Sequence, residues 1–174
     1  MNEINLKGAI EALLFSSPAP LTLKKIADIL EVPTKDLREP LLKLMEEYQE
    51  NNHGVIIREV AGGFKMFTRP EFACFINKLK RSKKRRLSRP ALETLAIVAY
   101  RQPITHGEIK EIRGVEVREI LHTLLERKLI RVVGKREGVG HPLLYGTTQE
   151  FLQYFGLKSL KELPRVEELC MEEK

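Results

Sequence analysis

The chain has 174 residues, of which 43% are hydrophobic and 31% charged, and its net charge is +6; this composition is typical of a soluble globular protein with one domain or two small ones. No stretch approaches the ~20 consecutive apolar residues of a membrane helix, and the N-terminus lacks a signal-peptide pattern. We therefore expect a cytoplasmic protein without membrane contact. Cys74 and Cys170 lie far apart without metal-ligand spacing, which argues against a disulfide framework or a zinc site.

The first half of the chain predicts three helices, over residues 6–17, 23–31 and 34–52. In each of them apolar residues recur three or four positions apart, as they do on one face of a helix. Thr22 can cap the second helix, because its hydroxyl can accept a bond from a free N–H of the first turn. Pro40 lies inside the third pattern, where it removes a backbone hydrogen bond and clashes with the preceding turn, so we expect a kink or a later start.

A β-hairpin is predicted after the third helix, with strands over residues 55–61 and 64–68 joined by two adjacent glycines, which accept the positive φ of such a turn. Alternation along the strands places Ile56 and Phe67 on one face and the other apolar residues on the opposite face. A hairpin that is apolar on both faces needs a second cover. We expect this cover from a short helix over residues 70–79 or from another subunit, which makes Ile56 and Phe67 candidate dimer-interface residues.

Residues 78–89 form a basic strip with eight basic residues and no acidic one. Subtracting these eight positive charges from the net charge of +6 leaves −2 for the rest of the chain. The strip can hold phosphates, or it can be a solvated linker that keeps two domains apart. Candidate phosphate contacts, in the strip and in a later loop, are Lys80, Lys83, Lys84, Arg85, Arg86, Lys135 and Arg136.

The second half begins with a helix over residues 89–101. Ser88 can cap this helix, and Pro90 lies in the first turn, where its missing N–H is tolerated. The Gln102-Pro103 step ends the helix, because a residue before proline is disfavoured in the α region. Spacing predicts one inward-facing set: Leu92, Leu95, Ala96 and Ala99.

Thr105 and Glu108 have the spacing of a capping box at the start of the next helix, and Gly114 can end it. The remaining pattern alternates between helical and extended segments. The later elements are predicted over residues 116–128 (helix), 130–133 and 143–145 (strands) and 149–155 (helix, which Thr148 can cap), followed by an apolar stripe to Pro164.

The two halves share one spacing. Eight positions between Pro20 and Leu41 recur in chemical type 83 residues later, between Pro103 and Leu124. A period of this length indicates a duplicated domain, because solenoid repeats span ~20–50 residues. The predicted fold is therefore mainly α with small β-hairpins, in two tandem winged-helix domains. The expected boundaries are 1–80 and 87–164 for the domains, 81–89 for the basic linker and 165–174 for a polar tail.

The sequence shows no catalytic group of residues. Its four histidines have neither the spacing nor the neighbours of metal ligands or of acid–base pairs. The Gly-Val-Gly at residues 138–140 lacks the rest of a dinucleotide-binding motif. We therefore expect a protein that is not an enzyme and has no cofactor or metal.

The third helix of a winged helix often enters the major groove of DNA. Here residues 116–128 have a net charge of zero and residues 34–50 carry −2, whereas contacts with phosphates supply much of the affinity for DNA. A winged-helix DNA-binding transcriptional regulator is therefore the alternative interpretation rather than the favoured one. DNA binding, where it occurs, should be weak, sequence-independent and sensitive to salt.

A protein partner is the favoured interpretation. Grooves between the helices and the wing can accept a partner segment, and aromatic and arginine side chains are frequent anchors of interfaces. The alternative, that the apolar members of this set belong to the core, stays open. The candidate partner-binding residues are Tyr100, Arg101, Leu143, Leu144 and Tyr145.

Four segments of the second half are LETLAIVAYRQPIT, EIRGV, TLLERKLIRVVG and GHPLLYGTT. In order and spacing they resemble segregation and condensation protein B, the accessory subunit of the bacterial condensin-like complex. The resemblance implies a homodimer associated through the first domains, which binds the kleisin subunit (segregation and condensation protein A type) that bridges the SMC ATPase heads. It also implies a non-enzymatic, nucleoid-associated role in chromosome condensation and segregation, with ATP hydrolysis left to the SMC partner.

Overall fold

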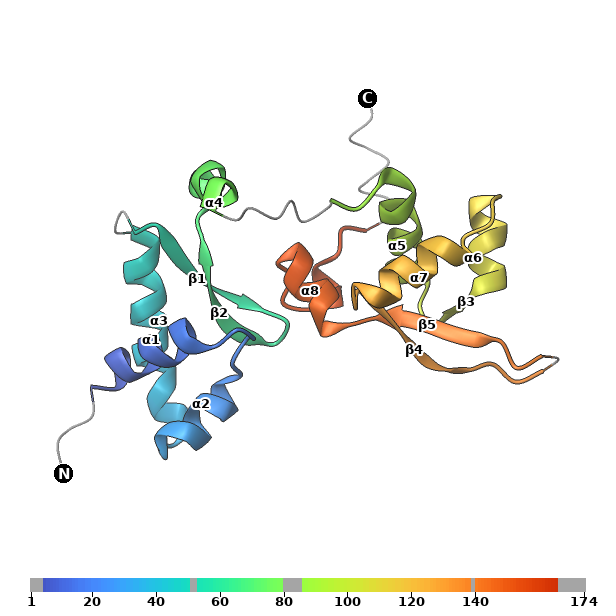
Figure 1. Ribbon diagram of the computed structural model, residues 1–174. Helices are drawn as coiled ribbons and strands as arrows, with labels where there is room; N and C mark the ends of the chain where they lie inside the picture. The colour runs from blue at the N-terminus through green and yellow to red at the C-terminus, as the bar shows by residue number, and fades with distance from the viewer. Residues whose placement is uncertain (1–4, 51–52, 80–85, 139, 166–174) are drawn as a thin grey trace. The chain divides into compact units, whose positions relative to one another are not determined.

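The computed structural model describes residues 5–50, 53–79, 86–138 and 140–165 (Figure 1). The chain forms two compact units. Unit 1 consists of residues 1–83 together with residues 157–174, and unit 2 consists of residues 84–156. Helices predominate in both units, and each unit contains a small antiparallel sheet, as the sequence predicts.

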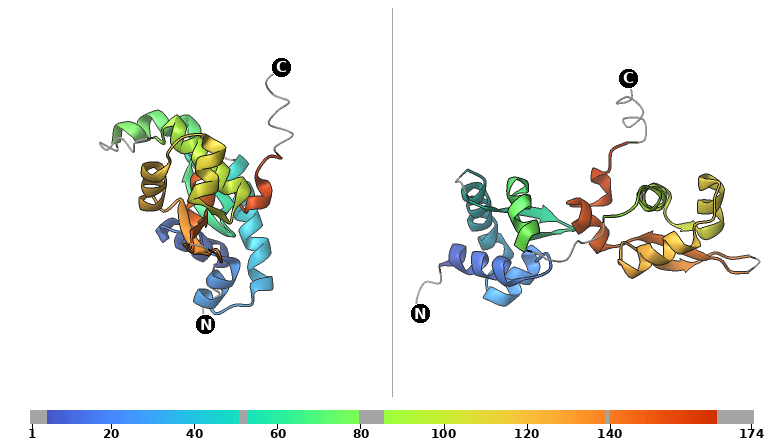
Figure 2. Two further views of the ribbon diagram at one scale, coloured as in Figure 1. Left: turned by 90° about the vertical axis from the view of Figure 1, so that its right-hand side faces the viewer. Right: turned by 45° about the horizontal axis from the view of Figure 1, so that its top comes forward.

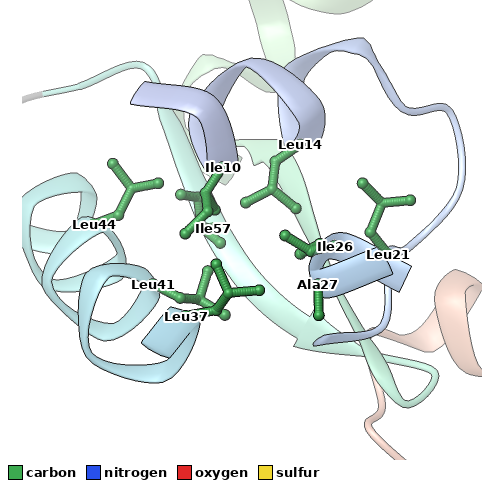
Figure 3. Packing of buried hydrophobic residues seen from close by; sticks show 9 residues of the cluster. All are labelled: Ile10, Leu14, Leu21, Ile26, Ala27, Leu37, Leu41, Leu44 and Ile57. Atoms are coloured by element: carbon green, nitrogen blue, oxygen red, sulfur yellow. The ribbon is translucent and has the colours of Figure 1, made fainter. Parts of the chain in front are cut away.

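Unit 1 packs its first three helices against a hairpin. Its core consists of buried apolar residues from these helices, from the segment before α2 and from β1 (Figure 3). Thr22 caps α2 as predicted, since its hydroxyl accepts a bond from the N–H of Lys25. The elements are α1 (Leu6–Ser16), α2 (Leu23–Leu30), α3 (Thr34–Glu50), β1 (Val55–Val60), β2 (Gly63–Thr68), the 3-10 turn η1 (Pro70–Phe72) and α4 (Ala73–Leu79).

Helix α3 begins at Thr34 and continues through Pro40. A proline inside a helix costs about 3 kcal/mol, but this helix buries Leu37, Leu41 and Leu44 in the core. Each buried leucine contributes roughly 1.5–3 kcal/mol. The apolar face therefore outweighs the proline, and the later start expected from Pro40 is wrong, because α3 already begins at Thr34.

The hairpin turn lies one residue earlier than the sequence suggests. Ala61 and Gly62 form it, with φ values of 51° and 73°, whereas Gly63 is already part of β2 and pairs with Val60. Gly63 is needed for space: a Cβ there would lie 2.9 Å from the carbonyl carbon and oxygen of Leu21. Leu21 is this close because it exchanges backbone hydrogen bonds of 2.9 and 2.8 Å with Phe64.

Unit 2 repeats this plan with a third strand in its sheet, in the order β3-β5-β4. Its predicted caps are present: Ser88, Thr105 and Thr148 each accept a bond from a first-turn N–H. The tip of the β4-β5 hairpin projects beyond the helices of this unit (Figure 2). The elements are α5 (Arg89–Arg101), β3 (Ile104–Thr105), α6 (His106–Arg113), α7 (Arg118–Glu126), β4 (Ile130–Lys135), β5 (Leu143–Thr147) and α8 (Gln149–Phe155).

The predicted repeat of 83 residues is visible in the structure. Helices α2 and α6 both have eight residues, and both are capped by a threonine. Both end at a residue in the left-handed region, Glu31 at φ 55° and Gly114 at φ 69°. The residues before the caps, Leu21 and Ile104, are both buried and both pair with the hairpin of their own unit. Each unit therefore has the element order predicted for a winged helix.

The inner face of α5 is rotated by one residue from the prediction. Leu92 and Ala96, which were expected inside, are exposed. Both the predicted and the observed sets have helical spacing, and the polar Thr94 made the observed set look like the outer one. The side chains that face the core are Ala91, Thr94, Leu95, Val98 and Ala99.

The segment after α8 packs with unit 1. The carbonyls of Leu157 and Lys158 accept bonds of 2.9 and 3.1 Å from the N–H groups of Ala61 and Gly62, and the Lys158 ammonium lies 3.0 Å from a Glu59 carboxylate oxygen. A second 3-10 turn, η2 (Leu160–Glu162), follows. The sequence assigned residues up to 164 to the second domain. In the structure the segment groups with unit 1, because its carbonyls accept hydrogen bonds from N–H groups of the hairpin turn.

The capping box of α6 also holds the second hairpin. One Glu108 carboxylate oxygen accepts a 2.9 Å bond from the Thr105 N–H, and the other accepts a 2.9 Å bond from Arg136 Nη1. These bonds, that from Arg136 first, lower the pKa of Glu108 from 4.5 to about 2. The carboxylate therefore connects the start of α6 to the hairpin tip.

We predict that Gly63→Ala destabilises unit 1 by about 1–3 kcal/mol, because the new methyl group would displace the Leu21 backbone. Gly134→Ala is the matched control in the second hairpin, where a Cβ would meet no atom within 4 Å. Denaturant unfolding of the two variants measures the difference. Equal losses of unfolding free energy would show that the close approach is unimportant.

We also predict a pH dependence from Glu108. Its folded pKa lies below the ordinary value of 4.5, so its stabilising effect is complete above that pH and is lost as the pH falls to about 2. The stability difference between wild type and Glu108→Gln should therefore be constant above pH 4.5 and shrink toward pH 2. Urea unfolding at a series of pH values tests this, with Glu111→Gln, at an exposed position of the same helix, as the matched control.

Candidate protein-binding surfaces

The end of α5 and the return strand β5 meet in unit 2, as the candidate partner site requires. The Gln102 side chain accepts bonds of 2.7 and 3.0 Å from the N–H and hydroxyl of Thr147, and it donates to the Ala99 carbonyl at 3.1 Å. Strand β3 then pairs Ile104 with Tyr145. The two groups of predicted partner residues are thereby held beside the same short strand.

The exposure of these residues differs. Arg101 and Leu143 are exposed, while Tyr100, Leu144 and Tyr145 are half-buried. Leu143 and Tyr145 are two residues apart on β5 and share one face of the sheet. Val132 is the cross-strand partner of Tyr145 and lies on that face too. We call Val132, Leu143 and Tyr145 the second-wing surface.

Strand β4 was not singled out by the sequence as a binding element. It is at the edge of its sheet, and every residue after Ile130 is exposed. Its outer backbone groups are available for pairing with an extended segment. The sequence carried one signal for this, the adjacent apolar pair Val132 and Val133, because alternation would place one of the two outside.

The candidate phosphate contacts fall into three groups. Lys80, Lys83, Lys84 and Arg85 lie outside the described residues. Arg86 and Lys135 are exposed. Arg136 is engaged with Glu108, so a phosphate would have to displace a carboxylate from it.

The third helix of unit 2 presents mixed charges. Arg118 is exposed on α7 together with Glu119 and Glu126. His122 lies 3.6 Å from a carboxylate oxygen of Glu126. An acidic residue beside each basic one opposes approach to phosphates.

The candidate dimer residues of unit 1 are less accessible than expected. Ile56 is buried within the unit and Phe67 is half-buried, so Ile56 adds little to a surface that a second subunit could cover. Large exposed apolar side chains lie on several helices of unit 1, and three of them, Phe72, Phe75 and Leu79, follow one another on η1 and α4.

The described part of the chain contains neither a cluster of metal ligands nor a candidate membrane span. No three metal-ligating side chains come together there. No helix of that part is both long enough and apolar enough to cross a bilayer.

Residues 8–166 match the family model of the segregation and condensation complex subunit ScpB. A segregation and condensation protein B from Symbiobacterium thermophilum is 52% identical over 92% of this chain and 74% of its own length; one from Desulforamulus reducens is 51% identical over 95% and 92%. A solved structure titled as a dimer of the ScpB N-terminal domain complexed with ScpA peptide is 31% identical, covers 42% of this chain and 91% of its own, and has a TM-score of 0.40. The chain belongs to the ScpB family of segregation and condensation complex subunits.

Proposed function

We propose that this protein is a non-enzymatic subunit of a condensin-like SMC–kleisin complex. As a homodimer it would bind the kleisin subunit of the ScpA type and so support chromosome condensation and segregation at the nucleoid. Membership of the ScpB family, matched over residues 8–166, is the observation that carries this proposal. The solved relative is titled as complexed with ScpA peptide, and we propose a partner of the same type for this chain.

The second-wing surface is the proposed contact for the kleisin, together with Arg101. It offers apolar side chains on one face of a sheet whose edge strand β4 pairs with no other described strand on its outer side. An extended kleisin segment could add to this edge through backbone hydrogen bonds, while Leu143 and Val132 give it apolar contacts. Ordering such a segment costs conformational entropy, which the buried apolar area must exceed.

The mixed charge of α7 supports a protein partner over a DNA-reading role for unit 2. A reading helix must approach phosphates, and α7 exposes two glutamates beside its one arginine. Weak, salt-sensitive DNA binding by Arg86 and Lys135 is compatible with the proposal. A sequence-specific regulator is not.

Leu143→Asp tests the proposed contact. We predict at least a tenfold loss of affinity for the ScpA-type kleisin of the same genome, because the charge would be buried without a partner. The matched control is Leu160→Asp in unit 1, since both leucines are 39% exposed. Size-exclusion chromatography of the mixed proteins at low and high salt, with titration calorimetry, provides the measurement.

An apolar contact should persist at high salt. The proposal fails if wild-type protein does not co-elute with the kleisin at either salt concentration, or if it instead shifts duplex DNA with sequence preference. If Leu143→Asp and Leu160→Asp lose the same affinity for the kleisin, the protein still binds the kleisin but the second-wing surface is not the contact.

A further inference from the structure

The strongest unexplained feature of unit 1 is the apolar stripe on η1 and α4. Phe72, Phe75 and Leu79 follow the spacing i, i+3, i+7, which places them along one side of a helix. Phe75 is 65% exposed and Leu79 is 79% exposed. In Figure 1 α4 lies outside the core that α1, α2 and α3 form. We call these three residues the α4 stripe.

Helix α4 has too little packing to account for its own stability. It has seven residues, and none of them is buried. Among the described residues its one extensive neighbour is η1, the turn that precedes it. Helices this short do not hold in water by propensity alone and depend on a packed apolar face. The α4 stripe is therefore a face that lacks its cover.

We propose that the cover is the α4 stripe of a second copy of this chain, packed antiparallel around a two-fold axis near Phe75. This inference rests on the homodimer in the proposed function and assigns its contact. A two-fold contact joins one patch to itself, so the patch must be complementary to itself. The α4 stripe meets this condition in shape, because its three apolar residues spread evenly along the helix.

The charges beside the stripe meet the same condition. Glu71 and Lys78 are both exposed, and at 100° per residue they project from the same flank of the stripe. When two such helices pack antiparallel, equal flanks face each other, so Glu71 of each copy lies near Lys78 of the other. Parallel packing would instead set this flank of one copy against the other flank of its partner, where Ala73 and Ile76 lie, so Glu71 and Lys78 would not pair. The charge order therefore selects the antiparallel pair.

The same charges favour a second copy over the kleisin as occupant. An arbitrary partner would not need an acidic and a basic residue at opposite ends of one flank. The second-wing surface in unit 2 also leaves the α4 stripe free for a different contact. The candidates that the sequence suggested, Ile56 and Phe67, then lie in the same unit as the contact but do not form its centre.

Phe75→Asp tests the apolar contact, with Asn77→Asp as control. Asn77 is exposed and projects from the side of α4 opposite the stripe, so both variants add one charge to the same helix. Sedimentation equilibrium should show a dimer for wild type and Asn77→Asp, and at least tenfold weaker association for Phe75→Asp. Circular dichroism and thermal unfolding confirm that each variant is folded.

A charge exchange gives a test that does not depend on folding. Glu71→Lys or Lys78→Glu alone should weaken the dimer about two- to tenfold at low salt, and the double variant should restore it. A dimeric wild type that Phe75→Asp leaves intact overturns this inference while the proposed function stands. A monomeric wild type overturns the homodimer as well. Loss of kleisin binding by Phe75→Asp with the dimer unchanged would make the stripe a partner site and also overturn it.

Discussion

Both units depend on one backbone contact, the pairing of the residue before the second helix with the return strand of the hairpin. In unit 1 Leu21 and Phe64 exchange two hydrogen bonds, and in unit 2 Ile104 pairs with Tyr145. The side chains of Leu21 and Ile104 are buried at the same time. Because a capping threonine follows directly in both cases, the contact fixes the start of a helix and the position of the hairpin together. A substitution that separates the strands would thus affect the helix as well.

The sequence predicted the features that depend on local chemistry. Caps at Thr22, Ser88, Thr105 and Thr148 were found from residue type and spacing alone, because a hydroxyl and a free N–H three residues later form the bond whatever surrounds them. The repeat of 83 residues was visible for the same reason. The repeated positions include a residue that pairs with the hairpin, a helix cap and the buried residues of the next turn, and each of these depends on its neighbours in the sequence.

What the sequence missed depends on contacts between distant segments. The turn at Ala61-Gly62 follows from the space that Leu21 leaves at Gly63, some 40 residues away in the chain. The packing of residues 157–163 on unit 1 follows from free N–H groups at that turn. On α5 two helical faces were equally periodic, and only packing against α6 and α7 selected the one with Thr94. The burial of Ile56 and the pairing of Arg136 with Glu108 are of the same kind, because neither follows from the sequence near the residue itself.

The two units have the same order of elements, but they differ in how far the first strand of the hairpin is exposed. In unit 1 strand β1 is largely covered, with Ile56, Ile57 and Val60 buried, and residues 157 and 158 close its turn. In unit 2 the corresponding strand β4 is exposed after its first residue. The two units share the order of their helices and the threonine caps, so these features do not explain the difference. It comes from the third helix, which has 17 residues in α3 and nine in α7, and from the returning C-terminal segment, which bonds to the hairpin turn of unit 1. A duplicated domain can therefore supply one copy for association with itself and leave the hairpin of the other for a different polypeptide.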